Sequence, residues 1–193
     1  MTEVAGTLVR ECIARLEDAD RRVAEVTAGL PAPQANFQPG PKKWSVCECL
    51  EHIAVTAESY FPGLEKLLRR GRERGITGGE PYGPGTWFGR YLESVLRAGP
   101  QAKKVSAPPS FRPSRGNHEL AAATRRVLDA NRRLRELAAA AEGLALGRLR
   151  MGSPALFLLR ISAAQVFETL VLHVHRHLDQ AERVRQSPGF PAA

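Results

Sequence analysis

The sequence lacks the features of membrane, secreted and zinc-finger proteins. No run among its 193 residues approaches the roughly 18 consecutive apolar residues of a membrane-spanning helix. The chain begins MTE and has no basic segment followed by an apolar one, so we expect no secretory signal. Cysteine is scarce, and the spacing of Cys47 and Cys49 does not match a zinc finger. With Cys12 the number of thiols is odd, and we expect structural thiols in a reducing cytoplasm.

The sequence also lacks a stacking platform for nucleic-acid bases. A net charge of +8 invites the hypothesis of an anionic partner. The positive charge is dispersed, however, in short arginine runs near residues 69–74, 125–135 and 183–185, with no aromatic residues between them. Solvated helix faces are the favoured interpretation, and we do not expect a nucleic-acid partner.

The apolar periodicity predicts an all-α fold. The length suits one well-buried core, and we expect a single domain over residues 1–190. Apolar residues recur at helical spacing in four long segments, at about residues 2–28, 46–74, 118–141 and 163–186. Four long helices without strand alternation predict a four-helix bundle.

Local signals place the helix ends. Residues 45–48 (SVCE) and 162–165 (SAAQ) each match a capping box, in which the serine and the fourth residue exchange hydrogen bonds with the backbone. Pro62 should kink or interrupt the second helix, and Asn117 is the expected N-cap of the third.

A long irregular crossover should join the second and third helices. Residues 75–116 are rich in glycine and proline, and a connection of this length in a compact domain often has a function. Within it, residues 86–98 could form a short amphipathic helix. Residues 103–113 should be extended and lie across the surface.

The last helix carries a histidine pair suited to metal binding. His173 and His177 are four residues apart and therefore share one helix face, with Gln180 three residues further on. His175 lies about 200° round the helix from His173 and cannot join them. Two imidazoles at this spacing can bind one ion, as in the H-E-x-x-H helix of metalloproteases. Since Val174 follows His173 here, the glutamate of that motif is missing.

A complete site needs a third ligand from another helix. His52 is the other histidine within a predicted long helix, although it lies about 120° from the main apolar stripe of that helix. Cys47 and Glu48 are alternatives, but Glu48 is better used in its capping box. The spacing alone also allows a hydrogen-bonded or exposed pair of histidines without any metal.

Two motifs resemble those of the DinB/YfiT-like superfamily. Residues 44–53 (WSVCECLEHI) are similar to the W-S-x-x-E-x-L-x-H start of that family's second helix, and residues 173–180 to its H-x-x-x-H-x-x-Q. The resemblance implies a bundle with one long crossover, often a homodimer. It also implies that His52, His173 and His177 bind a divalent ion such as Zn, Ni, Fe or Mn. Some members transfer low-molecular-weight thiols, and others have no known activity.

These observations support a hypothesis of metal-dependent thiol transfer to small electrophiles. Three nitrogen ligands leave coordination positions open, as catalytic sites require. Gln180 would lie behind a ligand or face the substrate, and Thr56 and Ser59 share the face of His52 and could line the pocket. No acidic residue near the ligands stands out as a base, which favours thiolate delivery over hydrolysis. A metal-dependent hydrolase and a non-enzymatic metal-binding or structural dimer are the alternatives.

Overall fold

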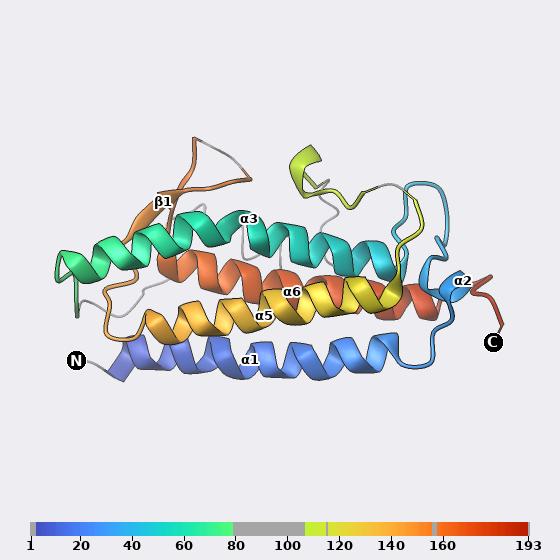
Figure 1. The fold of residues 1–193 in the computed structure, drawn as a ribbon, viewed down its shortest axis with the longest axis horizontal. Helices are drawn as coiled ribbons and strands as arrows, with labels where there is room; N and C mark the ends of the chain where they lie inside the picture. The colour runs from blue at the N-terminus through green and yellow to red at the C-terminus, as the bar shows by residue number, and fades with distance from the viewer. Residues whose placement is uncertain (1–2, 79–106, 115, 156–157, 193) are drawn as a thin grey trace.

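The chain forms a bundle of four long helices (Figure 1). The computed structural model describes residues 3–78, 107–114, 116–155 and 158–192. The long helices are α1 (Glu3–Thr27), α3 (Val46–Glu73), α5 (Leu120–Ala140) and α6 (Ala163–Arg185). Both α1 and α3 pack mainly against α5 and α6, so α1 and α3 occupy opposite corners of the bundle. The predicted all-α fold is confirmed. Among the described residues, no helix is long and apolar enough to cross a membrane.

The helix directions explain the long connection between α3 and α5. In Figure 1 the colours show that α3 and α5 run in one direction and α1 and α6 in the other. Because α3 and α5 are parallel, the end of α3 and the start of α5 lie at opposite ends of the bundle, which agrees with the predicted long connection between them. The expected helix at 86–98 lies outside the described residues. Pro109–Phe111 form a 3-10 turn, η1, with Phe111 buried, so the expectation of an extended surface segment is wrong there.

Both predicted capping boxes are present. Ser45 Oγ accepts a hydrogen bond from the Glu48 backbone N–H, and the Ser45 N–H donates to the Glu48 carboxylate at 2.8 Å. Ser162 and Gln165 repeat the exchange at the start of α6. These boxes define where α3 and α6 begin, and therefore the height at which their histidines lie.

The structure tests two expectations about helix ends and breaks. Pro62 lies inside α3, so the expected interruption is absent there, and the neighbouring Tyr60 and Leu64 are buried in the core. Asn117 does not cap α5, which begins at Leu120. The backbone N–H of His118 donates instead to the Asn36 side chain at 2.8 Å, and this contact delays the start of the helix. Asn36 follows the short helix α2 (Ala32–Ala35).

A small hairpin between α5 and α6 is the feature that the sequence did not predict. Strands β1 (Arg150–Gly152) and β2 (Arg160–Ser162) pair antiparallel, with Met151 opposite Ile161. Three-residue strands are too short for an alternating pattern to be recognised. The chain leading into the hairpin approaches α3 closely, since a Cβ added at Gly71 would lie 2.8 Å from Leu149 Cδ1.

The apolar core divides into two clusters, one in each half of the bundle. Leu16, Leu64 and Phe167 belong to the half near the hairpin, and Leu50 and Leu178 to the half near the C-terminus. Along both α3 and α6 the boundary between the clusters falls among polar buried residues. These are His52, Thr56, His173 and His177. The middle of the bundle therefore contains a polar layer.

Candidate metal centre

Three buried histidines meet in this polar layer. His52 on α3 faces His173 and His177 on α6, and the exposed fractions of the three residues are 3%, 7% and 8%. The Nε2 atoms of His52 and His173 are 3.0 Å apart. Ring centroids are separated by 4.4 Å for His52 and His177 and by 4.5 Å for the pair on α6. One ring nitrogen from each residue lies within 4.8 Å of the others, so the three rings surround one point.

Hydrogen bonds to oxygen atoms fix two of the rings. His52 Nδ1 lies 2.5 Å from the carbonyl oxygen of Phe111, and His177 Nδ1 lies 3.0 Å from Gln180 Oε1. A carbonyl oxygen only accepts, so each Nδ1 carries the proton and donates. In the neutral ring the lone pair is then on Nε2. This is the arrangement by which proteins orient metal-binding histidines.

Trp44 forms an apolar wall beside the site. Its ring centroid is 4.5 Å from that of His52 and 5.7 Å from that of His177. Trp44 directly precedes Ser45, whose capping box fixes the start of α3. The local sequence therefore positions both the tryptophan and, two turns later, the histidine.

Burial keeps the three imidazoles neutral. Desolvation lowers the pKa of His52 to about 4, against a weaker opposing effect of the hydrogen bond to Phe111. It also lowers the pKa values of His173 and His177 well below the ordinary value, and repulsion from the neighbouring histidines adds to the effect. Neutral imidazole is the form that binds a metal, so the site needs no deprotonation at neutral pH.

The residues present fit a divalent ion. Two nitrogens bound at 2.0–2.1 Å to one tetrahedral ion are about 3.3 Å apart, close to the observed separation of the His52 and His173 Nε2 atoms. Among the described residues, these three histidines are the group of side chains that lie close enough together to hold a metal ion. The group includes no carboxylate or thiol. The three histidines could therefore hold one metal ion and leave part of its coordination open.

The two alternative ligands have other roles. Cys47 Sγ lies 3.9 Å from the carbonyl oxygen of His118, and burial raises the pKa of this thiol to about 11. The Glu48 carboxylate accepts hydrogen bonds from the Ser45 backbone at 2.8 Å and from Gln38 at 2.7 Å. Neither residue belongs to the histidine group.

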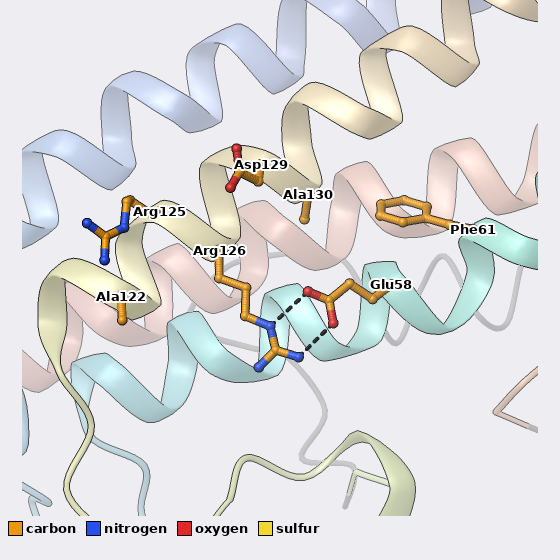
Figure 2. A pocket seen from close by; sticks show the side chains of 7 residues that line it. All are labelled: Glu58, Phe61, Ala122, Arg125, Arg126, Asp129 and Ala130. Atoms are coloured by element: carbon orange, nitrogen blue, oxygen red, sulfur yellow. Dashed lines mark hydrogen bonds and ion pairs between the residues drawn. The ribbon is translucent and has the colours of Figure 1, made fainter.

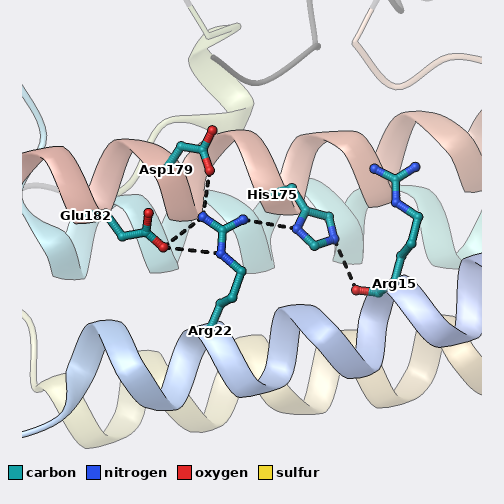
Figure 3. Close-up of polar contacts among 5 residues, drawn as sticks. All are labelled: Arg15, Arg22, His175, Asp179 and Glu182. Atoms are coloured by element: carbon teal, nitrogen blue, oxygen red, sulfur yellow. Dashed lines mark hydrogen bonds and ion pairs between the residues drawn. The ribbon is translucent and has the colours of Figure 1, made fainter. Parts of the chain in front are cut away.

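His175 points away from the site, as the helix rotation predicts. Figure 3 shows it between α6 and α1, where His175 Nε2 donates to the carbonyl oxygen of Arg15 at 3.1 Å. Arg22 donates to His175 Nδ1 at 3.1 Å and also pairs with Asp179 and Glu182 at 2.6 and 2.7 Å. This histidine joins two helices and is not a candidate ligand.

The three predicted neighbours of the ligands differ in their contacts. Gln180 bonds directly to His177, as described above. Ser59 Oγ donates to the carbonyl oxygen of Thr56 at 2.6 Å, so its hydroxyl turns back to its own helix. Thr56 is 4% exposed, and within the described part of the chain its hydroxyl has no hydrogen-bond partner. Sequence reasoning missed the Phe111 carbonyl, for which no local signal exists, and gave no role to Trp44, although it is part of the motif.

A surface hollow lies between α3 and α5, away from the histidines. It has a volume of about 410 Å³, and its lining includes Glu58, Phe61 and Arg126 but none of the three histidines (Figure 2). Arg126 donates to both Glu58 carboxylate oxygens, at 2.8 and 2.6 Å, and a third bond reaches Glu51. Arg126, Glu58 and Glu51 are therefore paired with one another at this hollow.

Comparison with known proteins identifies the family. The family model of the DinB superfamily matches residues 15–181. The chain belongs to the DinB superfamily. The match contains both motifs and all three histidines, so the resemblance noted in the sequence is confirmed for this DinB chain. No curated protein and no solved structure matches it.

Proposed function

We propose that the chain binds one divalent metal ion through Nε2 of His52, His173 and His177, and that it transfers a low-molecular-weight thiol to a small electrophile. This proposal rests on two hydrogen bonds, in which Nδ1–H of His52 and Nδ1–H of His177 each donate to an oxygen atom. Because the protons are on Nδ1, the lone pairs of both rings are on Nε2 and are directed to one point. Family membership supports it, because the matched region contains the complete trio.

Each residue of the site would have a distinct role. A divalent ion held by the trio would supply a Lewis acid that stabilises a thiolate at neutral pH. Gln180 holds the ring of His177, and the Phe111 carbonyl holds that of His52. Trp44, whose ring lies against those of His52 and His177, would shield these two ligands from water. Since the ligand group includes no carboxylate, a nucleophile that needs no general base suits this site better than water.

The metal, the compartment and the assembly complete the proposal. Three imidazoles accept Zn, Ni, Fe or Mn, and availability selects among them. Cys12, Cys47 and Cys49 are buried free thiols, which suits a reducing cytoplasm.

We further propose a homodimer, for which light scattering after size-exclusion chromatography is the direct test. A mass of one chain would contradict it.

Metal content tests the binding step. Untagged protein should contain about one divalent ion per chain by inductively coupled plasma mass spectrometry. His52→Ala, His173→Ala and His177→Ala should each lose it while far-ultraviolet circular dichroism shows retained helix. His175→Ala is the matched control on the same helix and should keep the ion. If the wild-type protein takes up none of Zn, Ni, Mn or Fe, the proposal is wrong.

Thiol-dependent turnover tests the chemical step. The metal-loaded protein is assayed with a panel of small electrophiles and low-molecular-weight thiols, with and without a chelator. We expect product only when both thiol and metal are present. Product formed without thiol would favour the hydrolase instead, and metal-loaded protein without turnover would support the non-enzymatic alternative.

A further inference from the structure

Thr56 has a buried hydroxyl group that makes no hydrogen bond to its own helix. Two other threonines in the long helices donate to the carbonyl oxygen four residues earlier: Thr27 to Val23 at 2.8 Å and Thr124 to Leu120 at 2.7 Å. Thr56 is more buried than either, yet its Oγ1 makes no such bond and has no other partner among the residues that the structure describes. A buried hydroxyl without a partner destabilises a fold and calls for an explanation.

The position of Thr56 connects this hydroxyl with the histidine site. Thr56 lies one turn after His52 on the same face of α3, and the Cα–Cβ bonds of a helix tilt toward its N-terminus, here toward His52. The turn η1 covers this face, because the Phe111 carbonyl bonds to His52 and the Phe111 ring lies 6.3 Å from that of Tyr60, one turn beyond Thr56. Thr56 is therefore enclosed between the histidine site and the apolar core.

We propose that Thr56 Oγ1 donates a hydrogen bond to the small anionic ligand, such as a thiolate, that shares the metal site with the three histidines. This inference rests on the proposed function, since it requires a metal with an open position. It makes Thr56 a positioning residue that favours ligands with an acceptor atom. A hydrogen bond to a charged group is stronger than one to a neutral group, so the interaction should be measurable by affinity.

Azide binding to the cobalt(II)-loaded protein tests this role. The visible absorption of bound cobalt gives the number of cobalt ions per chain. The change in this absorption when azide is added gives the dissociation constant of azide. Thr56→Val should bind one cobalt per chain, as the wild type does, but bind azide about tenfold more weakly, which corresponds to one lost hydrogen bond to a charged partner. Thr56→Ser restores the hydroxyl and should restore most of the affinity. Thr124→Val removes a hydroxyl that is already bonded and should leave azide binding unchanged.

Unfolding of the metal-free protein gives an independent readout. Thr56→Val removes a buried hydroxyl without a partner, so its urea midpoint should equal or exceed that of the wild type. A clearly lower midpoint would mean that the hydroxyl already has a partner within the fold, and would overturn the inference. Equal azide affinities with cobalt bound would refute the role of Thr56 alone. If the wild type binds no cobalt, the proposed function and this inference both fail.

Discussion

Acid should destabilise the metal-free protein, because its buried histidines are neutral. Burial lowers the pKa of His52 to about 4, against an ordinary value of 6.5 in an unfolded chain. Between these two values the unfolded chain binds a proton that the folded chain does not. The contribution of neutral His52 to the free energy of unfolding is therefore fully present above pH 6.5 and is lost as the pH falls toward 4. At 1.36 kcal/mol per pH unit, the complete loss from His52 is about 3 kcal/mol.

The loss should be large well before pH 4. Between pH 7.5 and pH 5, linkage gives about 2 kcal/mol for His52 alone. Burial lowers the pKa values of His173 and His177 in the same direction, so both add to this loss of stability in acid. Less urea should therefore unfold the metal-free protein at pH 5 than at pH 7.5.

Urea titrations followed by circular dichroism, with a chelator present, measure this effect. The free energy of unfolding should fall steeply from pH 7.5 to pH 5, and His52→Gln should remove about 2 kcal/mol of that fall. His118→Gln, which removes a histidine outside the cluster, is the control substitution. A wild-type stability that does not change over this range would refute the reasoning, as would an equal slope in His52→Gln.

Two further predictions concern the thiols and the first capping box. Burial raises the pKa of Cys12 to about 12 and that of Cys47 to about 11. Iodoacetamide at pH 8 should therefore leave the native protein unmodified and alkylate all three cysteines in guanidinium, as mass spectrometry would report; rapid labelling of the native protein would contradict this. Ser45→Ala removes the side-chain acceptor for the Glu48 N–H and should lower the free energy of unfolding by about 1 kcal/mol. An unchanged urea midpoint would argue against a stabilising cap.

Local rules were enough to predict the helices and part of the site. The capping boxes at Ser45 and Ser162 depend on residues three apart, and the structure has both. The exclusion of His175 from the pair formed by His173 and His177 needed only the rotation per residue of an α-helix. Such features are encoded within one or two turns, and therefore the sequence displays them directly.

Contacts between distant segments could not be predicted in this way. The Phe111 carbonyl that bonds to His52 is a backbone atom 59 positions away, and any residue type could supply it. The periodicity of α3 places His52 away from the main apolar stripe. Its burial becomes understandable once η1 is seen to cover that side. The pattern left Cys47 and Glu48 as alternatives to His52, and the family resemblance selected His52 as the third candidate ligand.

The polar layer also includes residues of α1 and α5. It helps to fix the position of each helix along the bundle relative to its neighbours. Asn131 on α5 is 1% exposed and donates to Asp20 on α1 at 2.7 Å. Like the histidines of α3 and α6, it lies where the two apolar clusters meet. A slide of one helix by a single turn, about 5.4 Å, would separate these partners and leave polar groups against apolar ones. Because unpaired buried polar groups are costly, the layer favours the alignment that brings His52 to the histidine pair.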